Sequence, residues 1–119
     1  MQTPITPKAS SLPFSYFAEL DIRVGTIASA AVVPNNDELL MLGVDFGQEL
    51  GILTILAAIA QSYNPETALG QQVVAVVNLA PITIMGITSQ GHLLFGHDKN
   101  GKPWLVLAGP NLHNGAEVG

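Results

Sequence analysis

The sequence predicts an all-β fold, a small closed barrel of five strands with one short helix. The length of 119 residues suits a single domain. Short apolar segments alternate with clusters of turn residues, which is typical of the short strands of a barrel. The clearest helix start, Asn64-Pro65-Glu66, falls between the third and fourth predicted strands. Area scaling implies that about two thirds of the surface is buried on folding, so a core forms without disulfides.

The first part of the chain predicts a tail, one helical turn and a long strand. Residues 1–13 contain three prolines and form a tail that is ordered only if it docks on another surface. The spacing of apolar residues over 14–18 indicates one helical turn, with Ser15 as its cap. A strand follows over 22–33, and Gly25 is expected to bend it or to form a bulge.

Two further strands and the helix come next. Turn residues at 34–37 precede a strand over 40–44, in which apolar side chains occupy alternate positions. Residues 52–59 are apolar at nearly every position, which predicts a third strand that is buried on both faces. The helix starts at 64–65, an asparagine cap followed by proline, and it ends at Gly70 after about two turns.

The last part of the chain predicts two more barrel strands and a hairpin. A fourth strand covers 73–79, and residues 82–85 extend or follow it. A fifth strand covers 92–95. The Asn-Gly pair at 100–101 is a strong hairpin signal, and it joins the fifth strand to an extended segment over 104–107.

This order of elements fits an OB-fold. Three predicted strands precede the helix and two follow it, which is the helix position expected of that five-stranded barrel. Residues 111–119 then form a closing loop. The domain proper is therefore expected over 14–119, after the tail.

The charge of the chain is acidic and sparse. Four Lys and Arg stand against nine Asp and Glu, for a net charge of −5, and charged residues make up 11% of the chain. An average domain has about 25%. With a mean hydropathy of +0.39, the chain is short of polar surface, so we expect a second copy to cover part of it in a homodimer. The acidic balance also disfavours tight binding of nucleic acid.

The residue content excludes several function classes. The chain has no cysteine, which excludes a disulfide scaffold, a thiolate zinc site and a cysteine nucleophile. The longest apolar stretch, 50–60, is too short to span a membrane, and no signal peptide is evident, so we expect a cytoplasmic protein. His92, His97 and His113 lack metal-site spacing, and Ser89 lacks a nucleophile elbow. We therefore expect no metal, no cofactor and no enzymatic activity.

Four short segments stand out by their order and spacing. They are Leu20-Asp21-Ile22-Arg23-Val24-Gly25-Thr26-Ile27, Tyr63-Asn64-Pro65-Glu66, Val77-Asn78-Leu79-Ala80-Pro81, and Met85-Gly86 followed by Ser89-Gln90-Gly91. Together they resemble the tRNA-binding domain family. That family includes the C-terminal appendage of bacterial methionyl-tRNA synthetase, free-standing structure-specific tRNA-binding proteins and CsaA-type export chaperones. The resemblance covers 14–119, and residues 14–17 are most similar to the small homodimeric members.

The resemblance implies a fold, an assembly and a ligand. It implies an OB-fold with dimer-forming extensions at both termini, and a face that recognises the outer corner of tRNA by shape. OB-folds use one barrel face and its flanking loops for such binding. The residues we expect to bind nucleic acid are Arg23, Asn35, Asn78, Ser89, Gln90, Gly91 and His92. The imidazole plane of His92 is suited to stack on a base or a ribose.

Departures from the family pattern remove positive charge. In the segment 33–38 an acid stands where the family usually has a base, and Ile82 stands where a basic residue is common. Arg23, Lys99 and Lys102 are the cations left within the domain. Each phosphate contact that is lost reduces the slope of log affinity against log salt by roughly 0.7–0.9. The sequence therefore predicts tRNA binding with reduced affinity.

Other interpretations remain open. Arg23 has a structural alternative, an ion pair with Glu19 or Asp21, and Asn78 has one as the holder of a loop through side-chain to backbone hydrogen bonds. At the level of function, one alternative is a CsaA-type module that binds unfolded or export-bound proteins and peptides on exposed apolar patches. Another is a barrel that has kept its fold and lost RNA binding.

Overall fold

The computed structural model describes residue 8 and residues 10–119, and over these residues the fold is mostly β with two short helices. Most of the predicted tail over 1–13 lies outside the described residues. Helix α1 spans Phe14–Ala18 and helix α2 spans Pro65–Ala68. Within the described ranges, no helix has the length and apolar character needed to cross a membrane.

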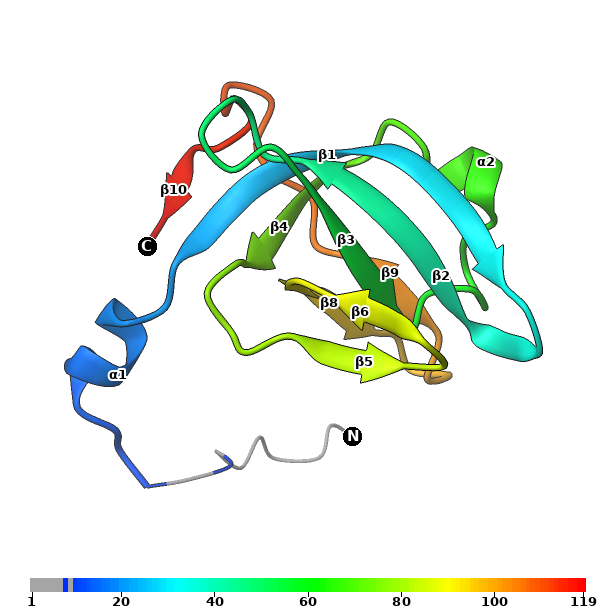
Figure 1. Ribbon diagram of the computed structural model, residues 1–119. Helices are drawn as coiled ribbons and strands as arrows, with labels where there is room; N and C mark the ends of the chain where they lie inside the picture. Colours follow the sequence, from blue (N-terminus) through cyan, green and yellow to red (C-terminus); the bar gives the residue numbers. More distant parts are fainter. Residues whose placement is uncertain (1–7, 9) are drawn as a thin grey trace.

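One antiparallel sheet forms the body of the molecule (Figure 1). Its strands lie in the order β3-β2-β1-β4-β7, and a short terminal strand, β10, pairs with the start of β1. The bounds are Ile22–Val33 for β1, Asn36–Asp45 for β2, Ile52–Ala57 for β3, Gln72–Val76 for β4, His92–Leu93 for β7 and Glu117–Val118 for β10. This strand order is the one expected of an OB-fold.

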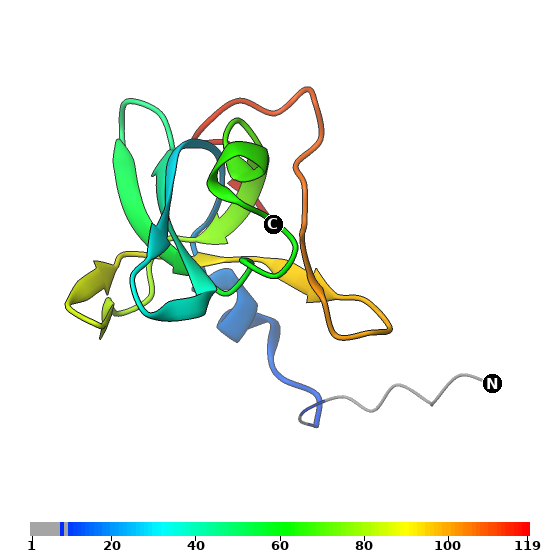
Figure 2. The ribbon, with the colours of Figure 1, turned by 90° about the vertical axis from the view of Figure 1, so that its right-hand side faces the viewer.

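Two small hairpins flank the sheet. Strands β5 (Ile82–Ile84) and β6 (Ile87–Ser89) form the first, and β8 (Phe95–His97) and β9 (Pro103–Leu105) form the second. Figure 2 shows the hairpins on opposite sides of the molecule, and the chain that contains β7 and β8 runs between them. This crossing segment therefore connects the two hairpins.

The predicted closed barrel is not confirmed. Strands β3 and β7 are the two edges of the ladder, and within the described residues they form no pairing with one another. The segment between β6 and β7 lies across this seam, where the backbone N–H of Gln90 donates to the carbonyl oxygen of Thr54 at 2.7 Å. The seam is bridged by a few hydrogen bonds in place of a continuous ladder.

The core lies inside the curved sheet. Its largest buried side chains are Phe46, Ile27, Leu40, Leu42, Ile55, Ile59 and Leu93. Strand β3 contributes only alternate residues, because Ile55 is fully buried whereas Ile52 is 63% exposed. The prediction of a strand buried on both faces was therefore wrong. On the outer face of β3, Ile52 is exposed and Leu56 is half-buried, where the β5–β6 hairpin lies beside the strand.

Gly25 has a packing role that differs from the predicted bend. The register shifts of β1 against β2 lie between Ile27 and Ser29 and at the end of the strand, away from Gly25. A Cβ atom at Gly25 would lie 2.7 Å from Val44 and 2.8 Å from Phe46. Glycine is therefore needed here because two core side chains occupy the space of a side chain.

The two helices form where local signals place them. The Asn64 side chain accepts from the Thr67 N–H at 2.8 Å, and the Thr67 hydroxyl accepts from the Asn64 N–H at 2.9 Å. This reciprocal cap confirms the predicted start of α2, although the helix makes one turn and not two. In α1 the N-cap is Pro13, without a side-chain cap, so the predicted capping role of Ser15 was wrong.

Three segments after α2 differ from the sequence prediction. Strand β4 ends at Val76, and the chain leaves the sheet before Pro81, which has no N–H to donate to a ladder. Residues 82–84 then pair with 87–89 as a separate hairpin. The predicted closing loop over 111–119 ends in a strand, β10, whose Val118 pairs with Ile22.

Candidate nucleic-acid interface

The β1–β2 loop and the β5–β6 hairpin meet at one end of the sheet. The Asn36 side-chain amide donates to the Met85 sulfur at 3.7 Å. Met85 and Gly86 form the tip of the hairpin with φ of 53° and 79°, and Asn35 in the loop has φ of 62°. Two consecutive residues with positive φ give the tight hairpin turn that matches strand twist. The contact places Asn35 beside the hairpin that leads to residues 89–92.

Residues 89 and 90 are held against the edge of β3 by their side chains. The backbone N–H of Leu56 donates to the Ser89 hydroxyl at 3.0 Å, and the N–H of Thr54 donates to Gln90 Oε1 at 2.8 Å. The Ser89 hydroxyl in turn donates to the Gly91 carbonyl at 3.1 Å. Ser89 is 9% exposed and therefore has a structural role, since it offers little surface to a ligand. These bonds satisfy donors of an edge strand and fix the segment in place.

Gly91 and His92 complete this segment in different ways. A Cβ atom at Gly91 would lie 3.1 Å from Ile55 and 3.2 Å from the Val76 carbonyl oxygen, so the backbone passes close to two strands. His92 pairs with Val76 in the ladder, and its side chain is exposed. Gln90 is also exposed, and its Nε2 donates to no other described residue. Gln90 and His92 thus offer their polar groups to a ligand.

An apolar cleft of about 230 Å³ lies beside this segment. Its walls come from β2, β3, the β5–β6 hairpin and the β7–β8 segment, and they include Leu39, Leu56, Leu79, Ile82, His92 and Phe95. Ile82 is 62% exposed and Leu79 is 46% exposed at the rim. The cleft therefore places exposed apolar surface next to the polar groups of Gln90 and His92.

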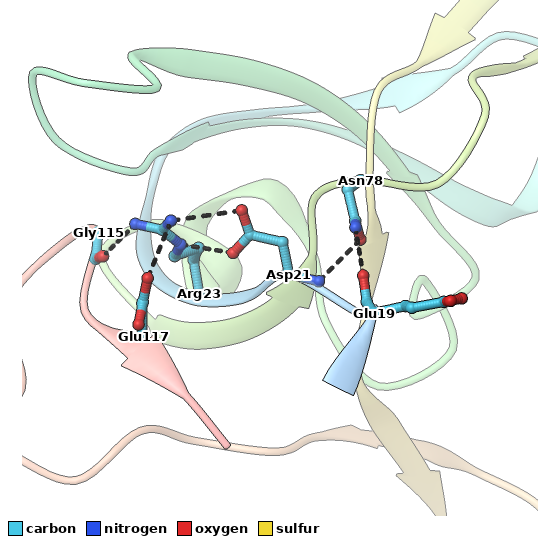
Figure 3. A network of polar contacts seen from close by, with 6 residues as sticks. All are labelled: Glu19, Asp21, Arg23, Asn78, Gly115 and Glu117. Atoms are coloured by element: carbon cyan, nitrogen blue, oxygen red, sulfur yellow. Dashed lines mark hydrogen bonds and ion pairs between the residues drawn. The ribbon is translucent and has the colours of Figure 1, made fainter. Parts of the chain in front are cut away.

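Arg23 lies in a separate polar network, shown in Figure 3. Its guanidinium pairs with the Asp21 carboxylate at 2.5 Å and with Glu117 at 3.4 Å, and it donates to the Gly115 carbonyl at 3.1 Å. The hydrogen bond that Arg23 donates to the Asp21 carboxylate raises the pKa of Arg23 above its ordinary value. Of the two acids that the sequence offered, Asp21 and not Glu19 pairs with Arg23, and Glu117 is a further carboxylate partner. Arg23 ties the start of β1 to the C-terminal segment.

Asn78 holds the connection between α1 and β1. Its Oδ1 accepts from the Asp21 N–H at 2.8 Å, and its Nδ2 donates to the Glu19 carbonyl at 2.7 Å (Figure 3). This confirms the interpretation of Asn78 as the holder of a loop. The fold thus divides the predicted site residues into two groups. Residues 89–92 and Asn35 lie along the β5–β6 side, and Arg23 and Asn78 belong to the network around Asp21.

The sequence did not mark the β8–β9 hairpin as a site, although it contains two of the four cations. Lys99 and Lys102 are exposed in its turn, and neither forms an ion pair with another described residue. Asp98 accepts from the Trp104 indole N–H at 2.9 Å and from the N–H of Lys102 at 3.0 Å. The Trp104 hydrogen bond, with those from the backbone, lowers the pKa of Asp98. The signal available in the sequence was the pair of lysines on either side of Asn100-Gly101.

Comparison with known proteins identifies the family. The family model described as "Putative tRNA binding domain" matches residues 22–116. The chain belongs to this tRNA-binding domain family. The match covers β1 through the segment before β10, and so includes both hairpins and the apolar cleft.

Relatives of this tRNA-binding domain occur within much longer proteins. A methionine–tRNA ligase of Bacteroides fragilis is 39% identical over 112 residues, which is 94% of this chain and 16% of the ligase. A methionine–tRNA ligase of Methanothrix thermoacetophila is 46% identical over 95 residues, 80% of this chain and 14% of the ligase. The chain thus spans about one sixth of the length of these ligases.

Solved structures of small proteins match nearly their whole length. A MetRS-related protein from Pyrococcus horikoshii has a TM-score of 0.84 at 30% identity, covering 92% of this chain and 99% of that one. The chaperone CsaA from Bacillus anthracis has a TM-score of 0.83 at 36% identity, covering 92% and 100%. The tRNA-binding domain fold is therefore shared with a synthetase-related protein and with a protein named as a chaperone.

Proposed function

We propose that this domain binds tRNA by shape, without catalytic activity of its own. The observation that carries the proposal is the attachment of residues 89–90 to the edge of β3 by hydrogen bonds from both side chains and from the backbone of Gln90. A surface fixed in this way loses little freedom on binding and suits a folded ligand of defined shape. The family model over 22–116 supports tRNA as that ligand.

The predicted site residues take two roles in this proposal. Three of them are exposed and contact the RNA through amide and imidazole groups, namely Asn35, Gln90 and His92. Four residues position this surface, because their side chains or backbones already form contacts within the fold. They are Ser89, Gly91, Asn78 and Arg23. The RNA-contacting surface therefore relies on neutral polar groups more than on cations.

Affinity is low in this proposal because acids flank the loop. Asp37 and Glu38 follow Asn35 after one residue, and both are exposed at the start of β2. Carboxylates at this end repel the phosphates of a docked RNA. We therefore expect a salt dependence that corresponds to few phosphate contacts, at roughly 0.7–0.9 in slope for each.

We propose a homodimer that forms through the terminal elements. No residue of α1 is buried, and Phe14 is 76% exposed, Tyr16 59% and Phe17 43%. Three exposed aromatic side chains on one helical turn form a patch of the kind that a protein partner covers. A second copy of the chain is the occupant we propose, in the cytoplasm where tRNA is present.

A binding assay with one matched pair of variants tests the RNA contact. His92→Ala is expected to weaken binding of labelled bulk tRNA by roughly fivefold or more, because a base loses its stacking partner. His113→Ala is the control, since His113 is also exposed but lies in the loop before β10. Equal affinities of both variants and the wild type contradict the proposed contact. Absence of binding by the wild type at low salt indicates a domain that has lost its RNA.

The apolar cleft favours a second candidate function, binding of unfolded or export-bound protein. Ile82→Asp places a charge at the cleft rim and is expected to abolish protection of an aggregating client. Ile52→Asp is the control, because Ile52 is 63% exposed, against 62% for Ile82, and does not line the cleft. If neither the wild type nor Ile52→Asp slows aggregation, this candidate is wrong.

A further inference from the structure

Three rings form a row along the segment that crosses between the two hairpins. The ring centroids of His92 and Phe95 lie 6.4 Å apart, and those of Phe95 and His97 lie 5.6 Å apart. His92 and His97 are exposed, and Phe95 is half-buried between them. Phe95 and His97 lie on the same face of β8 because side chains alternate along a strand. The row therefore starts at the proposed tRNA-contacting segment and leads away from it.

The row ends at the two lysines of the β8–β9 turn. Lys99 follows His97 after one residue, and Lys102 comes before Pro103, which pairs with His97. Trp104 pairs with Gly96 and so lies on the opposite face of the hairpin, where it packs on Tyr63 at 5.8 Å. Trp104 consequently leaves the ring row uncovered.

The charges around the row favour an anionic ligand. The turn has two lysines and one carboxylate, Asp98, which is bonded to the Trp104 indole and to backbone N–H groups. The other eight of the nine acidic residues lie outside this turn. An aromatic row that leads to free ammonium groups is the combination that binds single-stranded nucleic acid, with bases on the rings and phosphates on the lysines.

We propose that His92, Phe95 and His97, together with Lys99 and Lys102, form a contact for unpaired nucleotides of RNA. Two or three unstacked bases lie against the rings, and the phosphates that follow bind the lysines of the turn. This inference rests on the proposed tRNA binding and adds a second element to it. The shape-recognising surface at Asn35 and 89–91 engages the folded body of the RNA, and the ring row, which begins at His92, engages a single-stranded segment next to it.

The test uses a labelled RNA octamer of adenosine, an abasic octamer of the same length, and bulk tRNA. His97→Ala is expected to weaken binding of the adenosine octamer by about tenfold. It leaves the slope of log affinity against log salt unchanged. His97→Phe keeps a ring and is expected to restore the affinity. Lys99→Ala with Lys102→Ala is expected to reduce the slope by about 1.4. His113→Ala serves as the control, and thermal melting confirms that every variant folds.

The outcomes separate this inference from the proposed function. If the wild type binds tRNA and His97→Ala binds the adenosine octamer as tightly as His113→Ala does, the ring row is not a base contact. The same conclusion follows if the abasic octamer binds as tightly as the adenosine octamer. A salt slope unchanged in the double lysine variant overturns the phosphate contact. If the wild type binds neither tRNA nor octamer, the proposed tRNA binding itself is wrong.

Discussion

The Ser89 hydroxyl accepts a hydrogen bond from the backbone N–H of Leu56 at 3.0 Å, across the seam between the two edges of the sheet. A side chain thus takes the place that a neighbouring strand occupies in a closed barrel. The same hydroxyl donates to the Gly91 carbonyl, so its position is fixed from two directions. The seam and the proposed RNA-contacting surface therefore depend on one residue.

Ser89→Ala is expected to lower the free energy of unfolding by about 1–3 kcal/mol, because the N–H of Leu56 is left without its acceptor. Urea unfolding measures this change. The matched control is Thr88→Ala at the neighbouring position. It removes an exposed hydrogen bond between the hydroxyls of Thr83 and Thr88. This loss is expected to cost less than about 0.5 kcal/mol of unfolding free energy. Equal stabilities of the two variants contradict the structural role of Ser89.

Asn78→Ala removes two side-chain hydrogen bonds to the backbone of residues 19 and 21. The loss is expected to cost about 1–2 kcal/mol of unfolding free energy. It also frees the connection to α1, so dimer formation is expected to weaken. Asn111→Ala is the control, because Asn111 is exposed and its side chain makes no hydrogen bond to another described residue. Thermal unfolding together with sedimentation measures both effects, and an unchanged melting temperature contradicts this role of Asn78.

Asp98 predicts a pH dependence of stability in the acid range. Its pKa is lowered in the fold by the Trp104 N–H and by backbone hydrogen bonds. A lowered pKa means that the interaction stabilises the fold above the unfolded-state value of about 3.9 and is lost as the pH falls through the folded-state pKa. Trp104→Phe keeps an aromatic ring beside Tyr63 and removes the N–H donor.

The melting temperature of the wild type is therefore expected to exceed that of Trp104→Phe near pH 7. Part of this difference is expected to disappear as the pH falls below about 4, through the lowered folded-state pKa of Asp98. Melting curves over this pH range measure it. A difference that stays constant while Asp98 becomes protonated indicates that the indole N–H does not act through the Asp98 carboxylate.

The α1 patch predicts an oligomeric state. The wild type is expected to sediment at about twice the monomer mass of 12.5 kDa. The double variant Phe14→Asp with Tyr16→Asp is expected to give a folded monomer, because carboxylates replace the aromatic side chains that the second copy would cover. Ile52→Asp, which changes an exposed apolar residue on β3, is expected to remain dimeric. A monomeric wild type contradicts the proposed homodimer.

Much of the local structure was predictable from the sequence, because the signals are local. The asparagine and proline at 64–65 placed the start of α2, and the Asn100-Gly101 pair placed the β8–β9 hairpin. The burial of β3 was not predictable in this way, since it depends on whether another layer covers its outer face. The turn at Met85-Gly86 was missed because methionine is not a usual residue for positive φ.

The candidate site was only partly predictable for a similar reason. The resemblance pointed to residues 89–92 as candidates, and the acids at 19 and 21 indicated an ion pair with Arg23 without deciding between them. The sequence did not reveal that Ser89 bonds to β3, because that contact spans 33 residues. Nor did it reveal the ring row, which depends on the strand break between β7 and β8 and on the register that places Trp104 opposite Gly96.

The most direct measurement is fluorescence anisotropy of labelled bulk tRNA against the wild-type protein over a series of salt concentrations. We predict saturable binding that weakens as salt increases, with a slope that corresponds to a small number of phosphate contacts at roughly 0.7–0.9 each. Absence of saturable binding at low salt contradicts the proposed function. It would mean that the fold of the tRNA-binding domain family has been kept in this chain without its RNA ligand.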